Sequence, residues 1–282
     1  MTDRESTCAG KLPVYRVRAR NTSVESENKI HDDRVAAEYG FRGGLVPGVT
    51  VYAYMTVPIV EAFGYGWLES GSMQVKFHQP FYEGEQVSVH AEVDGDDVPV
   101  KIAVRAERDD GMVCATALAT VDDRTAWLGE ARIEDYPESP LPAYETRPAA
   151  SSDSIIVGAL LGTLKERIDL ADGEPLDMLD ERLAIYYGAK AVAHPFTLLG
   201  LANKALMDNY LLGPWIHVAS DLINRGVARD GEEISVRGRV KDRFERKGHE
   251  FVVLDLLLVA EGNRIVQQVR HTAIYRPRAK NG

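Results

Sequence analysis

The sequence predicts an α+β fold of two tandem units, each an antiparallel sheet wrapped around a central helix. Three observations support this prediction: an internal duplication, one long helical segment in each half, and a series of strands after each of those segments. With 282 residues, the chain is long enough for one large domain or two small ones. Two such units in tandem would pair their sheets edge to edge, which removes an exposed edge from each.

The duplication is a series of matched segments that keep their order along the two halves. The offset between the copies is 148 residues (180 − 32) at first, and 147 (230 − 83) after the loss of one residue. Short similarities arise easily by chance, but an ordered series does not, so we interpret the halves as copies of one unit. The matched pairs are DDRVAAEYG (32–40) with DERLAIYYG (180–188), Pro47 with Pro195, Trp67 with Trp215, and EGEQVSVHAEV (83–93) with DGEEISVRGRV (230–240).

Each half is expected to contain a short Asp-capped helix followed by a long one. Residues 196–212 combine good helix formers with apolar side chains at helical spacing. Residues 49–64 are rich in β-branched side chains and contain Pro58, so alone they fit either a helix or a strand. The duplication favours a helix here as well, bent or irregular near Pro58. Asp32 and Asp33 are expected to cap the first short helix.

Strands follow each long helix, because the segments there alternate or are apolar enough for a sheet. Gly84 and Gly231 predict tight turns, and Gly111 and Gly262 predict hairpins. The predicted strands are 71–81, 85–93, 98–107 and 111–121 in the first half, and 215–223, 232–240, 249–260 and 263–275 in the second.

The chain divides into two units with a linker between them. Residues 1–121 form the expected N-terminal unit and residues 154–282 the C-terminal one. Residues 122–153 hold several of the 13 prolines, so we interpret them as a linker that wraps the surface and not as a third domain.

The composition is that of a soluble globular protein, with 45% apolar and 27% charged residues. A net charge of −10 argues against a nucleic-acid partner. The N-terminus lacks an apolar signal core, and the most apolar run, 251–260, is too short to span a bilayer. Cys8 and Cys114 are interpreted as free thiols in a reducing compartment. We therefore expect a cytoplasmic protein with no membrane partner.

The stretch NKIHDDRVAAEYGFRGGLVPGVT (28–50) resembles the signature region of the MaoC-like acyl dehydratases and (R)-specific enoyl-CoA hydratases. VKFHQPFYEGEQVSV (75–89) is similar to a strand pair of the same family. The resemblance covers roughly 28–93 and reaches the second half only through the duplication. It implies a double hotdog, in which two hotdog units are fused in one chain.

The resemblance also implies which residues form a site. His31 matches the catalytic histidine of the family and Asn28 its asparagine. Gly48, followed by Val49, matches the glycine at the start of the central helix whose N–H binds the thioester carbonyl. The catalytic aspartate of the family lies five residues before the histidine, where this chain has Ser26.

Further departures limit the site. Lys29 replaces the usual proline, and the residue that corresponds to His31 in the second half is Leu179. At most one site of this type is therefore expected in each chain. Glu25 or Glu27 could replace the missing carboxylate if the loop runs differently.

These residue types suit the hydration of an α,β-unsaturated thioester. A histidine with a pKa near neutrality can move protons, and the N–H of a helix N-terminus favours a carbonyl oxygen that gains negative charge. Ser26 cannot replace a carboxylate as a base, although a hydroxyl can orient a water. No phosphate-cradling loop and no cluster with metal-ligand spacing is present in the sequence, so neither a metal nor a bound cofactor is expected.

Other interpretations of single residues stay open. His31 could be a loop histidine that caps the following helix. Trp67 and Trp215 are expected to be packing residues. His194, His217 and Asp221 could line a second, different site, and packing or surface roles are their default interpretation.

Three functions are compatible with the sequence. The leading hypothesis is an acyl-thioester hydratase or dehydratase whose substrate is carried on coenzyme A or acyl carrier protein. The alternatives are a non-catalytic acyl-thioester or lipid-binding protein, suggested by Ser26, and a thioesterase. A homodimer is possible, and the sequence leaves the carrier and the acyl chain length open.

Overall fold

The computed structural model describes residues 10–95, 99–122, 127–170 and 183–279. In these residues the first half has six strands and four helical segments. The strands are β1 (Gly10–Lys11), β2 (Tyr15–Arg18), β3 (Ser72–Phe77), β4 (Gln86–Asp94), β5 (Val100–Arg108) and β6 (Val113–Val121). The helical segments are the 3-10 helix η1 (Lys29–His31) and the α-helices α1 (Asp33–Glu38), α2 (Gly48–Phe63) and α3 (Tyr65–Ser70).

The rest of the chain repeats much of this order. Its strands are β7 (Leu164–Arg167), β8 (Ile216–Asn224), β9 (Glu233–Arg246), β10 (His249–Ala260) and β11 (Arg264–Arg276). Its long helix is α4 (Pro195–Asn209), and its 3-10 helices are η2 (Ile133–Asp135), η3 (Tyr144–Thr146) and η5 (Ala184–Tyr186).

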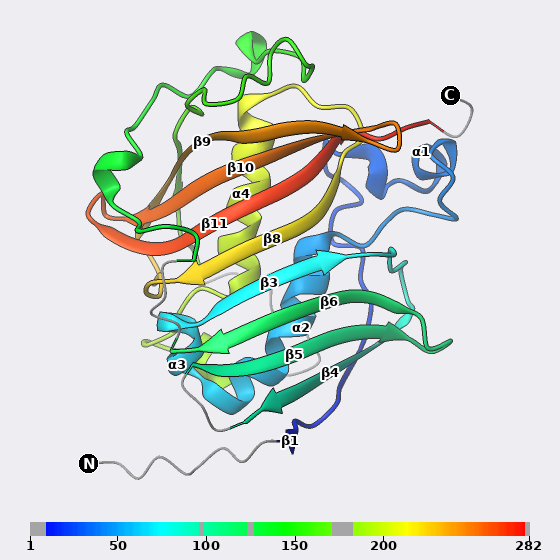
Figure 1. Cartoon of the computed structure of the whole chain (residues 1–282), viewed down its shortest axis with the longest axis vertical. Coiled ribbons are helices and arrows are strands. Elements are labelled where there is room, and N and C mark those ends of the chain that lie inside the picture. Colours follow the sequence, from blue (N-terminus) through cyan, green and yellow to red (C-terminus); the bar gives the residue numbers. More distant parts are fainter. Residues whose placement is uncertain (1–9, 96–98, 123–126, 171–182, 280–282) are drawn as a thin grey trace.

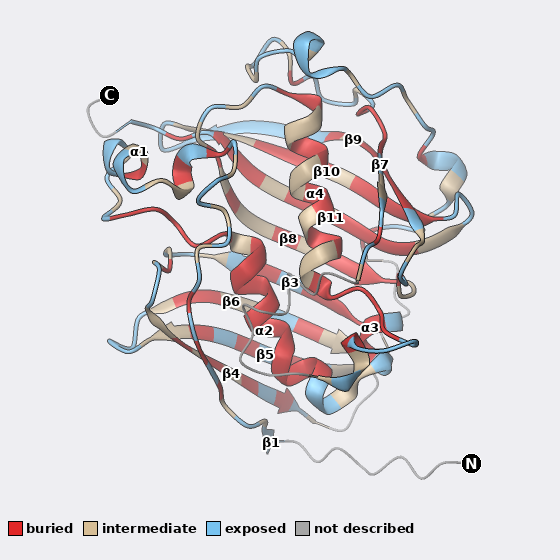
Figure 2. Cartoon of the chain, turned by 180° about the vertical axis from the view of Figure 1, so that it is seen from behind, coloured by how far each residue is buried: buried red, intermediate tan, exposed pale blue. Residues whose placement is uncertain are grey.

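The strands form one antiparallel sheet, and both long helices lie on the same face of it (Figures 1 and 2). The strand order in the described residues is β1-β4-β5-β6-β3-β8-β11-β10-β9-β7, and β2 also pairs with β4. The two halves therefore meet where β3 pairs with β8, from Ser72 opposite Ile223 to Lys76 opposite Ala219. The predicted edge-to-edge pairing of the two sheets is confirmed.

The helix α2 is buried all round, from Val49 to Val60 without interruption. It can be apolar on every side because the first sheet covers one side of it and α4 packs against it (Figure 2). The helix continues through Pro58, where the sequence predicted a bend or irregularity. In α4 one stripe of residues is only partly buried, including Asn203 and Met207.

The predicted turns are confirmed. Gly84 and Gly231 both have a φ of 78°, and Gly111 and Gly262 have φ values of 78° and 75°. These values are easily reached only by glycine, and they lie at equivalent turns of the two halves. The duplication is therefore visible in the backbone.

The two halves also differ. The helix α3, which contains Trp67, was not predicted, and Trp215 lies instead in the loop that leads into β8. The match between the two tryptophans at one sequence offset is therefore not a match in structure, although both side chains are buried, as expected. The second short helix was predicted at 180–188. Residues 180–182 lie outside the described residues, and the structure has a 3-10 helix at 184–186.

Only one of the two residues that were predicted to cap α1 does so. The carboxylate of Asp32 accepts a hydrogen bond from the N–H of Val35 at 3.0 Å, so Asp32 is the N-cap. Asp33 does not cap the helix. Its carboxylate accepts a hydrogen bond from the N–H of Gly44 at 2.7 Å and holds the loop before α2.

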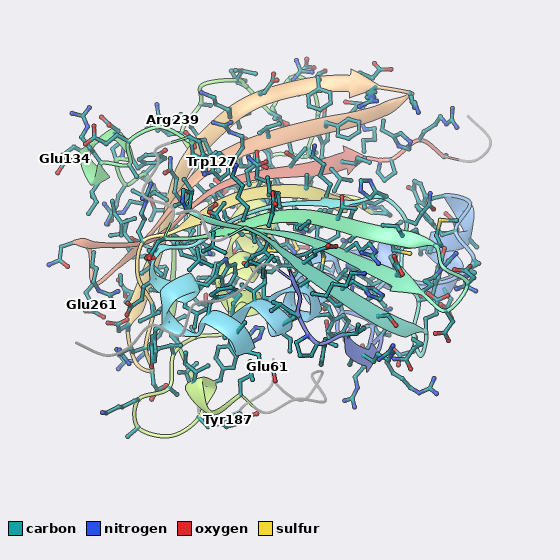
Figure 3. The ribbon with its side chains drawn as sticks, turned by 60° about the horizontal axis from the view of Figure 1, so that its bottom comes forward. Glu61, Trp127, Glu134, Tyr187, Arg239 and Glu261 are labelled. Atoms are coloured by element: carbon teal, nitrogen blue, oxygen red, sulfur yellow. The ribbon has the colours of Figure 1, made fainter. Side chains whose placement is uncertain are left out.

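The segment between the halves lies on the outer surface of the second sheet. Tyr136 is buried against Leu257 and Val259 of β10. Arg239 of β9 donates a hydrogen bond to the carbonyl of Asp135, and Figure 3 shows Arg239 at the same end of the molecule as Glu134 of this segment. The segment thus covers part of the sheet surface, and the boundaries 1–121, 122–153 and 154–282 stay a prediction.

Two further expectations concern the cysteines and the membrane. Cys114 is a buried free thiol whose pKa burial raises to about 11, and Cys8 lies outside the described residues. None of the described helices has both the length and the apolar character that crossing a membrane requires.

Buried polar side chains stabilise the junction of the halves. Nδ2 of Asn224 donates to the carbonyl of Trp67 at 3.0 Å, and Oδ1 accepts from Nε2 of Gln267 at 2.8 Å. We expect Asn224→Leu to lower the free energy of unfolding by about 1–3 kcal/mol, because it leaves buried polar groups without partners. Urea unfolding measures this, with Asn263→Leu in the exposed β10–β11 turn as the control. An equal loss in both variants would contradict the prediction.

Candidate active site

A cavity of about 220 Å³ lies between the two halves, where the end of β3 meets the beginning of β8. The first half supplies His31, the segment 45–48 that leads into α2, and the segment 77–81 that follows β3. The second half supplies Asn203 of α4 and the segment 215–218. Among the described residues no carboxylate lines this cavity, and much of its wall is apolar.

Asn28 connects the two halves at this cavity. Its side chain is 5% exposed. Oδ1 accepts a hydrogen bond from the N–H of Trp215 at 3.1 Å, and Nδ2 donates to the carbonyl of Trp215 at 2.9 Å. Because the backbone of Trp215 offers one donor and one acceptor, these contacts fix the orientation of the amide. Oδ1 also accepts from the N–H of Ile30, so the same side chain caps η1, which contains His31.

The imidazole of His31 is held in one neutral tautomer. Nδ1 lies 2.7 Å from the carbonyl oxygen of Leu45, which can only accept, so Nδ1 carries the proton and donates it. Nε2 is then unprotonated, and Nδ2 of Asn28 lies 3.3 Å from it as a donor. An unprotonated ring nitrogen in a residue that lines a cavity can act as a base.

Burial lowers the pKa of His31 below its usual value, and the hydrogen bond to the carbonyl of Leu45 partly opposes this. Desolvation disfavours the charged form of the ring because the imidazolium loses water contacts. The ring is therefore neutral at neutral pH and is available to take up a proton.

Gly44 allows the loop before α2 to approach the backbone of His31. A Cβ at Gly44 would lie 2.0 Å from the carbonyl oxygen of His31, which a side chain cannot do. The same carbonyl oxygen accepts a hydrogen bond from Nδ2 of Asn21 at 2.8 Å. Residue 44 therefore has to be a glycine for the loop to pass this close to the backbone of His31.

Gly48 is the first residue of α2 and lines the cavity with His31. The N–H groups of Thr50 and Val51 already bond to the carbonyl of Pro47. The N–H of Gly48 is one of the groups at a helix start that have no acceptor within the helix. Together with the helix dipole, it favours negative charge on an oxygen placed there.

The structure brings together three of the five residues that the sequence assigned to the site: His31, Asn28 and Gly48. Ser26 does not line the cavity, and its hydroxyl donates to the carbonyl of Asn28 at 3.3 Å. Val49 is buried and borders a groove along α4 outside the cavity.

The glutamates that could have replaced the missing carboxylate lie elsewhere. Glu25 and Glu27 are both exposed and line a neighbouring pocket beside Tyr210. Neither glutamate therefore supplies the cavity with the carboxylate that Ser26 cannot provide.

On the sequence alone, His217 is assigned a packing or surface role by default, with a second site as the alternative. It lines the same cavity as His31, not a second site. His194 instead caps α4, where its Nδ1 accepts from the N–H of Phe196 at 3.0 Å, and Asp221 does not line the cavity. The sequence could have placed His217 in this cavity, because it lies at the start of β8 and the predicted edge-to-edge pairing brings this point to the end of β3.

No protein-family model and no curated protein matches the chain. A MaoC domain protein of Chloroflexus aurantiacus has a TM-score of 0.70 at 11% identity, over 99% of this chain and 100% of that one. A conserved Mycobacterium tuberculosis protein, described as a double hotdog, has a TM-score of 0.64 at 14% identity, over 95% and 96%. A Thermobifida fusca chain named after thioesterase II has a TM-score of 0.52 at 14% identity, over 95% of each chain.

These comparisons show the fold. The chain is a double hotdog, as its resemblance to the MaoC-like family implied, and it shares this architecture over nearly its whole length with dehydratase-like and thioesterase-like proteins. At identities this low the activity has to be argued from the site itself.

Buried neutral histidines make the stability of the protein depend on pH. Burial lowers the pKa of each below about 6.5, so the unfolded chain binds more protons than the folded one as the pH falls through that value. We expect the free energy of unfolding to fall between about pH 7 and pH 5, by up to ~1.4 kcal/mol per pH unit for each histidine. The histidines are His31, His194, His217 and His271.

Urea unfolding at several pH values measures this dependence. The variant His271→Gln should show a shallower slope than the wild type, because it removes a group whose pKa burial lowers to about 3. A slope that is unchanged by the substitution would contradict the prediction.

Proposed function

We propose that the protein is an acyl-thioester hydratase or dehydratase. The observation that supports this most directly is that the unprotonated Nε2 of His31 and the start of α2 at Gly48 line one cavity. A base and a donor for a developing oxyanion are the two groups that the reaction needs.

In the proposed reaction, these residues add one water across the double bond of an enoyl thioester. The thioester carbonyl oxygen lies at the N–H of Gly48, and a water donates to Nε2 of His31 in place of the 3.3 Å contact from Nδ2 of Asn28. His31 takes a proton from the water as the water oxygen bonds to Cβ, and the electron pair of the double bond moves toward the carbonyl oxygen. The imidazolium then gives its proton to Cα. Hydroxyl and hydrogen are added with no net proton change, and dehydration is the reverse.

This mechanism uses one base, because no described carboxylate lines the cavity. The same observation supports the alternative of a non-catalytic acyl-thioester-binding protein. A thioesterase is a third candidate, since a water activated by His31 could attack the carbonyl carbon, and the chain shares its fold with a protein named after thioesterase II.

We expect His31→Gln to lower the rate of crotonyl-CoA hydration by about 10²–10⁴-fold, because the variant loses the base. The loss of enoyl absorbance measures the rate. Ser26→Ala is the control and should change it little, since its hydroxyl bonds to the carbonyl of Asn28 outside the cavity.

The outcomes separate the three functions. Release of free coenzyme A thiol without hydration would indicate the thioesterase. A rise in melting temperature with an acyl-CoA that is never consumed would indicate the binding protein. No turnover with any chain length, together with no effect of His31→Gln, rules out the proposed activity.

Exposed basic side chains near His249 support a binding site for the carrier of the acyl group. His249 lines the cavity, and the β9–β10 turn lies directly before it, at the same end of the molecule as α1 (Figure 1). Arg246 and Lys247 are exposed at this turn, in a chain with a net charge of −10. Coenzyme A and the arm of acyl carrier protein both carry phosphate, which such side chains bind well.

We expect the double variant Arg246→Glu, Lys247→Glu to raise KM for crotonyl-CoA about tenfold with kcat unchanged, because exposed ion pairs contribute up to ~1 kcal/mol each. The increase should shrink at high salt. Lys101→Glu with Arg16→Glu makes the same charge change on exposed residues of β5 and β2 and should leave KM unaltered. Equal effects of both pairs would show that net charge alone matters.

A further inference from the structure

A buried chain of hydrogen bonds joins β8 to β11 behind the cavity. Nε2 of His217 lies 2.8 Å from the hydroxyl of Ser220, and this hydroxyl lies 3.0 Å from Nδ1 of His271. The three side chains are 6%, 1% and 0% exposed. Ser220 and His271 are direct partners in the sheet, so the chain follows from the register of the two strands.

Both histidines are neutral. Burial, and then the neighbouring His271, lowers the pKa of His217 well below its usual value, and burial lowers the pKa of His271 to about 3. A neutral imidazole has one N–H and one unprotonated nitrogen, so the two rings and the hydroxyl must share their protons in a consistent order.

The order of donors is set by the far end of the chain. Nε2 of His271 is buried without a partner in the described structure. Nδ1 of His217, at the other end, also has no partner among the described residues, but His217 lines the cavity, where a ligand oxygen can accept, and His271 does not. A buried donor needs an acceptor, so with a ligand bound Nε2 of His271 is the unprotonated end and Nδ1 of His271 carries the proton. His271 then donates to Ser220, and Ser220 donates to Nε2 of His217. The remaining proton of His217 is therefore on Nδ1.

Nδ1 of His217 is also buried without a partner in the described structure, and the residue lines the cavity with His31. It lies against the start of α2, because a Cβ at Gly48 would be 2.9 Å from this nitrogen. The ring of Phe77 contacts the imidazole edge to face, at 4.9 Å between centroids, and holds its orientation. Because Gly48 has no side chain, the first residue of α2 and the imidazole N–H of His217 can lie next to each other.

We propose that His217 is a second hydrogen-bond donor to the thioester carbonyl oxygen, supplied by the second half of the chain and held as a donor by Ser220 and His271. The inference rests on the proposed function only in taking an acyl thioester as the ligand. His217 contacts the substrate, and Ser220 and His271 are positioning residues.

The chemistry suits a neutral ring. A neutral donor requires no buried charge before the substrate binds, and it gains strength as charge develops on the oxygen. The donors at Gly48 and His217 come from opposite halves, so the two could close on one oxygen from two sides.

The test uses a thioester that cannot be hydrated. Butyryl-CoA with ¹³C at the carbonyl is bound to the full-length protein, and the carbonyl stretch is measured by infrared difference spectroscopy. The wild type should shift the band to lower frequency, because donors polarise the carbonyl. His217→Leu should lose at least about half of the shift and about 10²-fold in crotonyl-CoA hydration, the usual effect of removing one oxyanion donor.

Three further variants separate polarisation from folding. His217→Asn keeps an N–H near the position of Nδ1 and should restore part of the shift. Ser220→Ala, which removes the bond that fixes the tautomer, should weaken it. His194→Asn is the matched control, because His194 is also a buried neutral histidine with an unpartnered nitrogen, but it does not line the cavity. It should leave the shift intact.

The results distinguish this inference from the proposed function. A shift that depends on His217, without turnover of crotonyl-CoA, supports the inference and contradicts hydration. Turnover with a shift that His217→Leu does not change supports hydration and overturns the inference. The absence of a shifted band in the wild type, or an equal loss in His194→Asn, also overturns it.

Discussion

The pairing of β3 with β8 is the interaction on which the rest of the molecule depends. It turns two sheets into one and leaves neither half with an open edge at the junction. Because the strands are antiparallel, the end of β3 meets the start of β8, and the cavity lies at this point. Phe77 from one half therefore contacts His217 from the other. One hotdog unit alone would supply only part of the residues that line this cavity.

The duplication explains why the site is asymmetric. In the first half, Asn28 presents His31 and binds the backbone of Trp215, so the copy that contains the histidine also reaches into the other copy. In the second half, the residue aligned with His31 is Leu179, which lies outside the described residues. The second half instead contributes His217 from a strand. Duplication gave two similar frameworks, and each now supplies different groups to a common cavity.

The sequence predicted the architecture well because the duplication resolves what one copy leaves ambiguous. Residues 49–64 alone fit a strand as well as a helix, and only their match to 196–212 decided for the helix. The helix α3 was missed because the second half has no matching helix in the described residues. Gly84 and Gly231 were recognised because a turn of this kind requires a positive φ, which local sequence reveals.

The site was only partly predictable, for a physical reason. His31, Asn28 and Gly48 lie within 21 residues of one another, so a local pattern could identify them. His217 lies far away in sequence and enters the cavity only through the register between β3 and β8. Ser26 was assigned by its position relative to His31. Its side chain instead bonds to the backbone of Asn28, and the loop between them carries it away from the cavity.

The electrostatic character of the cavity follows from which side chains line it. Ser26 lies outside the cavity, no carboxylate, lysine or arginine of the described residues lines it, and His31 and His217 are neutral. A carboxylate would have to be desolvated in this largely apolar space, which disfavours its charged form. In the proposed hydration, charge would appear only during the reaction, as an imidazolium at His31 and an enolate oxygen at Gly48. In that proposed reaction the two opposite charges would form together and stabilise one another, so a cavity without a carboxylate still has a consistent way to move one proton.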